Sequence, residues 1–252
     1  MTACRQHIVL VTGDAPYLGG PITWSALRGA APEFDFIDVD LLDAGAGKSL
    51  ADTARLSIVK ALEGSSAIVA HGTACRVAIE AVALVDGAIP MLLLSPRIIT
   101  RQSLPLSVAR NLAGGICGEV LSLYARRKSR RLLVDDARLR QQLSLLVRSD
   151  AVSEDLVDEA RSRIADPRME FISARTGEMV REVLTPIDQR VNEAVLHRLV
   201  LFGNGPMDRK MRARWKGQLI EGAWSAPMLE VPQAVAAALR ALLSGQCERR
   251  KE

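Results

Sequence analysis

Aromatic side chains make up only 4% of this 252-residue chain. Proteins that read single-stranded nucleic acid stack its bases on aromatic side chains, so this scarcity argues against that function. The net charge of +4, from 33 basic and 29 acidic residues, is also too small to indicate a nucleic-acid surface. The composition therefore disfavours nucleic acid as a partner.

Long apolar runs and paired cysteines are missing as well. No apolar run reaches the roughly 18 residues of a membrane helix, so no transmembrane segment is expected. Cys4, Cys75, Cys117 and Cys247 lie far apart, which favours neither a disulfide framework nor a zinc site. The N-terminus leads directly into an apolar run without a signal segment. We expect a cytoplasmic protein without metal or cofactor.

What is present is an alternation of short apolar runs with segments of helical spacing. Strands are expected at His7–Val11, Phe34–Asp40, Ala67–Ala70, Pro90–Pro96, Leu199–Phe202 and Gln218–Ile220. Helices are expected at Ile22–Gly29, Leu50–Glu63, Ala74–Ala83, Met207–Lys216 and Pro232–Leu243. Such alternation is typical of a parallel sheet covered by helices on both faces. The sequence predicts an α/β fold with a mostly parallel sheet of about six strands.

Residues 98–195 interrupt this alternation because they contain no convincing strand. Helices are expected there at Leu104–Ala113, Ile116–Arg126, Ala137–Val147, Glu154–Ile164 and Glu170–Leu184. Ser153 precedes two acidic residues and is a typical helix N-cap. We expect an all-helical cap, 98–195, inserted into a core formed by 1–97 and 196–252. Such a cap would cover the carboxyl ends of the strands, where open α/β sheets bind ligands.

The run Ser66–Ala83 joins an apolar strand, a sharp turn at His71-Gly72-Thr73 and a helix. With small Ala70 and Ala74 on either side, it resembles the nucleophile elbow of the α/β-hydrolase family. Further motifs resemble the family in the same order: Thr12-Gly13 at the oxyanion loop, Trp24 in the first helix, Asp40-Leu41 before a glycine-rich turn to Ser49, Leu199–Gly203 before the acid, and Gly222–Pro232 at the histidine loop. The resemblance covers nearly the whole chain and implies the α/β-hydrolase fold with a helical cap.

The residues that carry the family's chemistry are absent from the matching positions. Gly72 stands at the nucleophile position and Ser225 at the histidine position. The acid position falls at Pro206, and Asp208 follows two residues later. We expect Asp208 to cap the following helix, with a surviving acid as the other interpretation. The sequence therefore resembles an α/β-hydrolase whose catalytic triad is degenerate.

The histidine count leads to the same conclusion without an alignment. A serine hydrolase needs a general base near its nucleophile. His7 and His197 begin strands at the end of the sheet opposite the elbow, and His71 precedes the nucleophile position. We expect a non-catalytic protein that serves as a ligand-binding or assembly subunit. The alternative is a weak or atypical hydrolase or lyase of small ester-like substrates that uses His71, Asp208 or Cys75.

Two sets of residues are candidates for binding. A small apolar ligand beneath the cap would contact Thr12, Gly13, Asp14, Thr73 and Trp224. An acidic partner, an anionic lipid surface or a polyanion would meet the basic run of the cap at Arg126, Arg127, Lys128, Arg130 and Arg131. A protein partner or a homo-oligomer is the expected kind of assembly. Trp224 has a second interpretation, in which its large ring fills the vacated pocket. Most basic runs are solvated surfaces, which is the other interpretation of the arginines.

Overall fold

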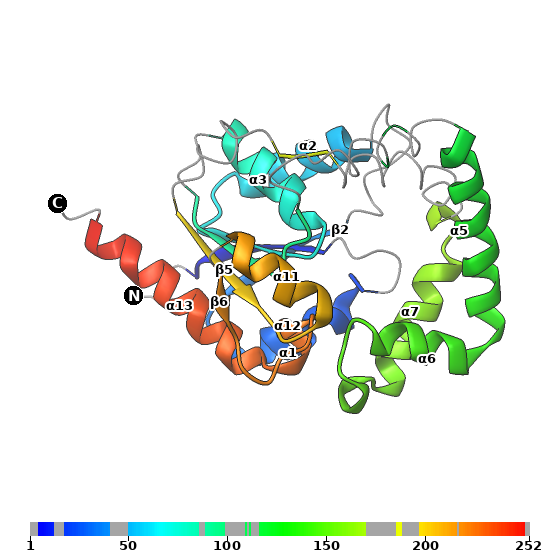
Figure 1. Ribbon diagram of the computed structural model, residues 1–252. Coiled ribbons are helices and arrows are strands. Elements are labelled where there is room, and N and C mark those ends of the chain that lie inside the picture. The colour runs from blue at the N-terminus through cyan, green and yellow to red at the C-terminus, as the bar shows by residue number, and fades with distance from the viewer. Residues whose placement is uncertain are drawn as a thin grey trace.

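The computed structural model describes residues 5–12, 18–40, 50–85, 89–98, 109, 111, 116–169, 185–187, 197–215 and 217–249. A six-stranded sheet lies at the centre, in the order β2-β1-β3-β4-β5-β6, and all its strand pairs are parallel (Figure 1). The strands are β1 (His7–Thr12), β2 (Asp35–Asp40), β3 (Ala67–His71), β4 (Met91–Leu94), β5 (Arg198–Phe202) and β6 (Gln218–Leu219). The six expected strands and their parallel arrangement are confirmed.

Alternate residues of each central strand face two separate apolar cores. Ile8 and Leu10 of β1 belong to a cluster that also contains Trp24, whereas Val9 and Val11 belong to a second cluster on the opposite face. The same division continues through β3, β4 and β5. Because both faces are buried, the interior positions of these strands are apolar on both faces, which is why the sequence showed continuous apolar runs.

Helices cover both faces of the sheet, as Figure 1 shows. Helices α2 (Leu50–Leu62), α3 (Ala74–Leu84) and α11 (Pro206–Trp215) contribute to the second cluster. Helices α1 (Pro21–Ala30), α12 (Pro227–Glu230) and α13 (Pro232–Arg249) contribute to the first. The sequence predicted all of these except α12, which is a single turn and too short to show a period. None of the described helices is long and apolar enough to span a membrane.

The strand order reverses beside β1. The chain passes from β1 to β2 on one side and then to β3 on the other, so the carboxyl ends of β1 and β3 flank the switch point. Thr12, the last residue of β1, is in register with His71, the last residue of β3. Open α/β sheets bind ligands at this kind of point, which places the predicted elbow where function is expected.

Between β4 and β5 the chain forms a helical insert, which we define as residues 116–169. It contains α5 (Ile116–Val134), α6 (Asp136–Ser144), the short 3₁₀ helix η2 (Ser149–Ala151) and α7 (Glu154–Ala165). Ser153 caps α7 as expected, because its hydroxyl accepts a hydrogen bond from the Leu156 N–H at 3.2 Å. Helix α5 continues eight residues beyond the predicted end at Arg126. The expected helices 104–113 and 170–184 lie outside the described residues, apart from 109 and 111.

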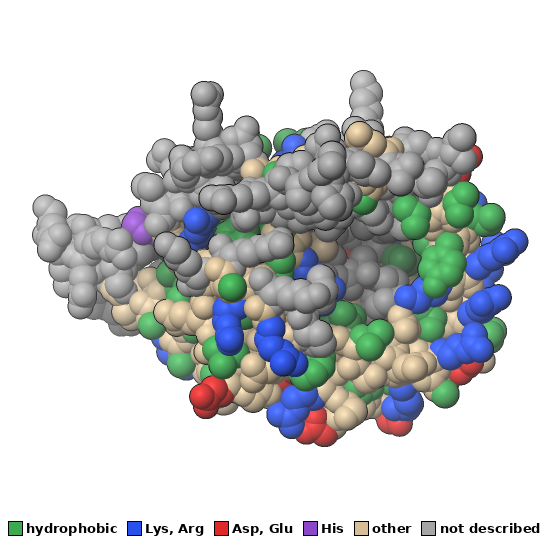
Figure 2. Space-filling model, viewed as in Figure 1, with side chains coloured by type: hydrophobic (Ala, Val, Ile, Leu, Met, Phe, Trp, Pro, Cys, Tyr) green, Lys and Arg blue, Asp and Glu red, His purple; other side chains and the backbone are tan. Residues whose placement is uncertain are grey.

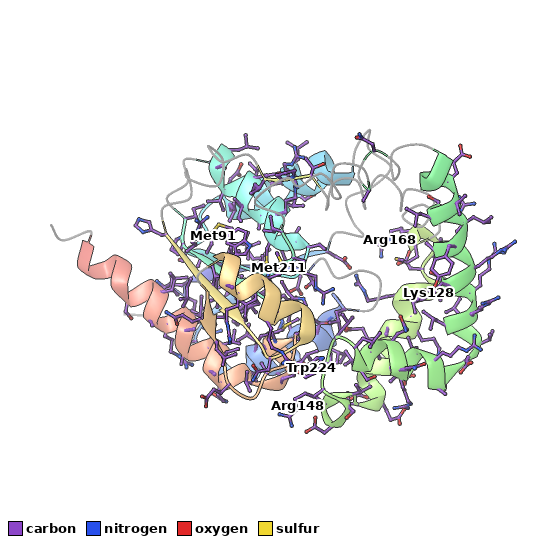
Figure 3. The ribbon with its side chains drawn as sticks, in the orientation of Figure 1. Met91, Lys128, Arg148, Arg168, Met211 and Trp224 are labelled. Atoms are coloured by element: carbon purple, nitrogen blue, oxygen red, sulfur yellow. The ribbon has the colours of Figure 1, made fainter. Side chains whose placement is uncertain are left out.

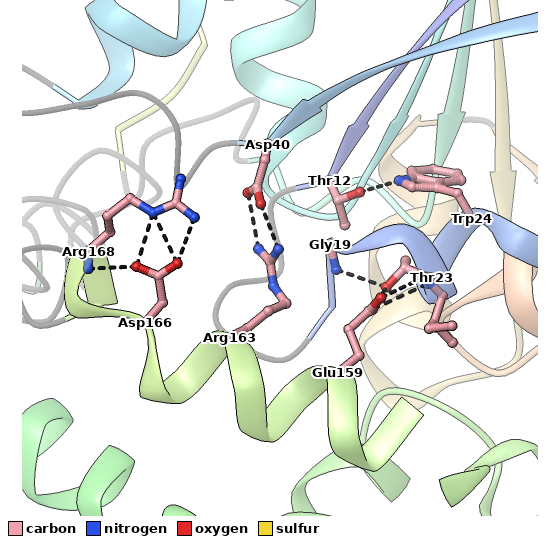
Figure 4. A network of polar contacts seen from close by, with 10 residues as sticks. Thr12, Gly19, Thr23, Trp24, Asp40, Glu159, Arg163, Asp166 and Arg168 are labelled. Atoms are coloured by element: carbon pink, nitrogen blue, oxygen red, sulfur yellow. Dashed lines mark hydrogen bonds and ion pairs between the residues drawn. The ribbon is translucent and has the colours of Figure 1, made fainter. Parts of the chain in front are cut away.

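Two residues of α7, Glu159 and Arg163, join the insert to the core (Figure 4). Glu159 accepts hydrogen bonds from the N–H of Ile22 at 2.5 Å and the hydroxyl of Thr23 at 2.8 Å, in the first turn of α1. Arg163 forms a bidentate pair with Asp40, at the carboxyl end of β2, with distances of 2.6 and 3.0 Å. An acid at a helix N-terminus and a bidentate guanidinium pair are both favourable arrangements, so the insert is firmly oriented.

A third contact joins the insert to α12 and the loop before it. The N–H of Arg148 donates to Glu230 at 2.7 Å, and its guanidinium donates to the carbonyl of Gly222 at 3.0 Å. Leu139, Leu143 and other leucines of the insert lie in the same apolar cluster as the core residues of α1 and α13. The insert is therefore packed on the sheet layer through a shared core. The predicted domain limits 98–195 stay a prediction, because both ends fall mainly outside the described residues.

Candidate functional site

The turn between β3 and α3 has the backbone of a nucleophile elbow. Gly72 has a φ of 61°, in the left-handed region that glycine adopts without strain. Its N–H donates to the carbonyl of Leu94 and its carbonyl accepts from the N–H of Arg97, each at 3.0 Å. The turn is thus fixed against the end of β4. The one position that the elbow presents outward carries no side chain.

Asp208, the candidate triad acid, is buried, and both of its carboxylate oxygens accept hydrogen bonds. Asp208 is 1% exposed. Its carboxylate accepts hydrogen bonds from the hydroxyl of Ser95 at 2.5 Å, the N–H of Gly203 at 2.9 Å and the hydroxyl of Ser225 at 3.3 Å. The expectation that Asp208 caps α11 is therefore wrong. Two buried serines from distant segments satisfy its oxygens more completely than the exposed end of a helix would.

Two glycines after β5 bring the acid loop against the histidine loop. A Cβ on Gly203 would lie 2.0 Å from the carbonyl oxygen of Trp224, and one on Gly205 would lie 2.3 Å from Oγ of Ser225. The N–H of Gly205 donates to that same Trp224 carbonyl at 2.8 Å. Only glycine allows this approach, so the backbone itself fills the space beside Ser225. Pro206 follows as the first residue of α11.

His71 is tied to the same loop. Its ring is 1% exposed, and Nε2 lies 2.7 Å from the carbonyl oxygen of Ser225. A carbonyl oxygen only accepts hydrogen bonds, so Nε2 carries the proton and donates it. With the proton on Nε2, the basic lone pair of the neutral ring is on Nδ1, which is buried as well. His7 is exposed at the first residue of β1 and His197 directly precedes β5, so both lie at the opposite end of the sheet, as expected.

Cys75 faces the core and not the turn. It is 0% exposed, and its thiol donates to the carbonyl of Ala70 at 3.2 Å. A structural thiol in apolar surroundings is unreactive, because only the thiolate is nucleophilic and burial disfavours that form. Thr73, before α3, is half-buried. The geometry therefore removes the thiol from the candidates for a displaced nucleophile.

The predicted ligand contacts are only partly brought together. The hydroxyl of Thr12 accepts a hydrogen bond from the indole N–H of Trp24 at 2.5 Å and is buried. Gly13 and Asp14 lie outside the described residues. Trp224 is half-buried and lies on the side of the molecule where Arg148 approaches from the insert (Figure 3). Within the described residues, the tryptophan packed beneath the end of β1 is thus Trp24.

The predicted basic residues all lie on α5, although in different surroundings. Arg127, Arg130 and Arg131 are exposed, whereas Arg126 and Lys128 are half-buried. The sequence did not single out the apolar side chains exposed on the same helix, Val120, Leu123 and Tyr124. Figure 2 shows apolar and basic side chains together along the edge of the molecule that α5 forms.

Two other residues that sequence reasoning missed are Ser95 and Glu230. Ser95 has a φ of 46° and is fully buried, so its backbone is held in an uncommon conformation beside Asp208. Glu230 accepts from the N–H groups of Trp224 at 2.7 Å and Ala226 at 3.2 Å, and so shapes the histidine loop. A polar residue directly after an apolar strand was the only available signal for Ser95. Among the described residues, no group of three or more histidine, cysteine, aspartate or glutamate side chains could hold a metal ion.

Comparisons with known proteins bear on the fold. No protein-family model matches the chain, and no curated protein matches its sequence. Solved structures do match over nearly its whole length. A meta-cleavage product hydrolase from Pseudomonas fluorescens has a TM-score of 0.67 at 13% identity, covering 96% of this chain and 91% of that one.

Two further matches have different activities in their names. A thermophilic esterase from Thermogutta terrifontis has a TM-score of 0.58 at 16% identity, covering 95% of this chain and 90% of the esterase. The enzyme 1H-3-hydroxy-4-oxoquinoline 2,4-dioxygenase has a TM-score of 0.57 at 13% identity, covering 95% and 92%. Identities this low establish a common architecture without a common activity. Together with the parallel sheet and the glycine elbow, they show that this chain has the α/β-hydrolase fold.

Proposed function

We propose that this chain is a non-catalytic α/β-hydrolase-fold protein that acts through binding, as a ligand-binding or assembly subunit. The observation that carries the proposal is the engagement of Asp208 by Ser95, Ser225 and Gly203. In a working triad, the acid orients a histidine that activates the nucleophile. Here the acid is bound by hydroxyls, neither of which is basic enough to take a proton from a nucleophile at neutral pH.

The absence of a nucleophile at Gly72 compounds this loss. An acyl-enzyme mechanism requires an attacking side chain and a base within hydrogen-bond reach of it. Removing single members of a triad reduces kcat by about 10⁴-fold or more, and their effects are not additive because they act as one unit. A site that lacks both has no acyl-transfer route. The sheet and helices of the α/β-hydrolase fold are nevertheless present, which supports a function that depends on the shape of the molecule and not on catalysis.

A second candidate is a weak or atypical hydrolase or lyase that works through His71. The observation that favours it is the elbow backbone, which keeps a positive φ at Gly72 directly beside the His71 ring. In such an enzyme Nε2 would keep its proton on the Ser225 carbonyl, and Nδ1 of the same ring would serve as the base. Asp208 would act on the same loop through Ser225.

Ester turnover in matched histidine variants separates the two candidates. The wild-type chain, His71→Gln and His7→Gln are assayed with p-nitrophenyl acetate and butyrate. His71→Gln removes the imidazole but keeps a side-chain N–H that can donate to the Ser225 carbonyl, and the exposed His7 provides the control. We expect no turnover above buffer in any of the three. Turnover that His71→Gln abolishes and His7→Gln retains would refute the non-catalytic proposal.

A further inference from the structure

Helix α5 exposes three large apolar side chains close together. Val120, Leu123 and Tyr124 are 62%, 52% and 64% exposed. Elsewhere in the described part of the chain, the exposed large apolar residues are scattered singly over other elements, apart from Val134 at the end of α5. A single exposed apolar side chain is ordinary, whereas a contiguous group marks a surface that contacts another molecule. The α5 group is therefore a candidate contact surface.

Two exposed cations, Arg127 and Arg131, lie on the same face of α5. Arg127 follows Tyr124 by three residues and Val120 by seven, and Arg131 follows Tyr124 by seven. These spacings place residues on one side of a helix. The apolar half and the basic half of this face together span about 17 Å, at a helical rise of about 1.5 Å per residue. Both halves can therefore contact one flat surface along the edge of the molecule that α5 forms (Figure 2).

Among the described residues, no acidic side chain pairs with Arg127 or Arg131. Helix α5 contains five basic residues and one acidic residue, Glu119, so it is strongly positive. Lys128 and Arg130 interact with other groups of the chain. The acidic residues after α5 pair with arginines outside it, as Asp135–Arg138, Asp136–Arg161, Glu154–Arg140 and Asp166–Arg168. Arg127 and Arg131 are therefore available to an anion outside the chain.

A second protein surface is a poor match for this face of α5. A specific protein interface buries about 800 Å² on each partner, whereas a helix face about 17 Å long and about 10 Å wide provides only a small part of that area. A second copy of the chain is a worse match, because a two-fold pairing of α5 with itself would bring two positively charged helices together. The face suits a partner that needs little shape complementarity.

An anionic lipid surface fits both halves of the face. Its phosphate headgroups lie directly above the acyl chains, and helices with exposed apolar and basic side chains bind in that boundary. A tyrosine ring with its polar hydroxyl suits the same depth. We propose that the outward face of α5 binds anionic lipid, with Val120, Leu123 and Tyr124 at the acyl boundary and Arg127 and Arg131 at the phosphates. This inference goes beyond the proposed function and does not depend on whether the elbow is catalytic.

Co-sedimentation of the full chain with vesicles tests the proposal. Vesicles of phosphatidylcholine alone are compared with vesicles that also contain about 30 mol% phosphatidylglycerol. We expect the wild-type chain to bind the anionic vesicles with half-saturation near about 1 mM lipid and to stay in the supernatant with the neutral vesicles. Equal sedimentation with both kinds of vesicle, or no binding to the anionic vesicles at about 10 mM lipid, would overturn the proposal.

Two double variants separate lipid binding from the attraction of a free polyanion. Arg127→Gln/Arg131→Gln should weaken binding to the anionic vesicles about 30-fold, because each arginine near a charged surface contributes about fivefold. Leu123→Ser/Tyr124→Ser should weaken it about tenfold or more, because the apolar contact with the acyl boundary is lost. Undiminished vesicle binding by either variant would reject the lipid assignment, and undiminished binding by the serine variant alone would favour a free polyanion.

Matched controls change exposed residues outside the insert. Arg5→Gln/Arg240→Gln removes the same charge, and Leu56→Ser/Leu84→Ser removes two leucines that are 68% and 69% exposed. We expect both controls to bind like wild type, and a loss equal to that of the α5 variants would overturn the proposal. Sedimentation velocity without lipid, with circular dichroism as a check of folding, should give the same coefficient for wild type and the α5 variants. A dimer that the serine variant of α5 dissociates would assign the face to a second copy of the chain and reject the proposal.

Discussion

Replacement of Asp208 tests whether this buried carboxylate stabilises the fold. Asp208→Ala removes the acceptor of three hydrogen bonds and leaves the hydroxyls of Ser95 and Ser225 and the N–H of Gly203 without it. Each buried donor left unsatisfied costs about 1–3 kcal/mol. Because the hydroxyls can rotate towards other acceptors, we expect a total loss of about 3–5 kcal/mol in the free energy of unfolding.

Asp208→Asn is the matched control because it preserves the shape of the side chain. Its amide oxygen can accept from Ser95 and Gly203, which both donate to Oδ2, while its NH₂ donates to the oxygen of Ser225. The hydrogen bonds become weaker without the charge, but the cost of burying that charge disappears. We expect the two effects to offset each other, so that Asp208→Asn changes stability by less than about 1 kcal/mol.

Urea unfolding at neutral pH, followed by circular dichroism, measures both variants. A change in midpoint at constant m-value reports stability alone. If Asp208→Asn were as unstable as Asp208→Ala, the negative charge and not the set of hydrogen bonds would stabilise this region. If Asp208→Ala cost less than about 1 kcal/mol, the three contacts would be incidental, and the structural role assigned to Asp208 would be wrong.

Two further predictions concern the insert. Gly20→Ala should destabilise the chain by about 1–3 kcal/mol, because a Cβ there would lie 2.5 Å from the carboxyl of Glu159, which is held by α1. Gly29→Ala, in open space near the end of α1, should stabilise it by about 0.5–1 kcal/mol, and thermal unfolding of both variants checks the contrast. Arg168 holds the pKa of the Asp166 carboxyl below its ordinary value. The pair therefore stabilises the fold above the unfolded pKa of about 3.9, and this contribution is lost as pH falls through the lower folded pKa. Arg168→Ala should remove this part of the acid dependence in urea unfolding below about pH 4, and an unchanged pH profile would contradict it.

Most of the sheet could be predicted from the sequence because its strands are buried on both faces. Residues such as Val9, Ile68 and Leu92 belong to continuous apolar runs, and the alternation of runs and helices fixes a parallel order. The elbow was predictable for a local reason, since a glycine between small residues at a strand–helix junction suits a turn with positive φ. Gly72 has that conformation.

The contacts that orient the insert could not be predicted from the sequence. Arg163 and Asp40 are 123 residues apart, and Glu159 reaches Ile22 across 137. Charged residues on helices carry no periodic signal that identifies a distant partner. The same limit explains why the hydrogen bonds of Asp208 were not predicted. Its position near the start of α11 favoured a local cap, whereas its partner Ser95 lies 113 residues earlier.

The burial of the Asp208 carboxylate has a physical explanation. A buried carboxylate that loses its hydrogen-bond donor becomes an unpaired charge, which is strongly destabilising. Ser225 donates to Asp208 from the loop before α12, and Ser95 adds a shorter hydrogen bond from the end of β4. These hydroxyls stabilise the carboxylate and are not themselves basic. The carboxylate can therefore be retained for folding alone, and its presence is no argument for catalysis.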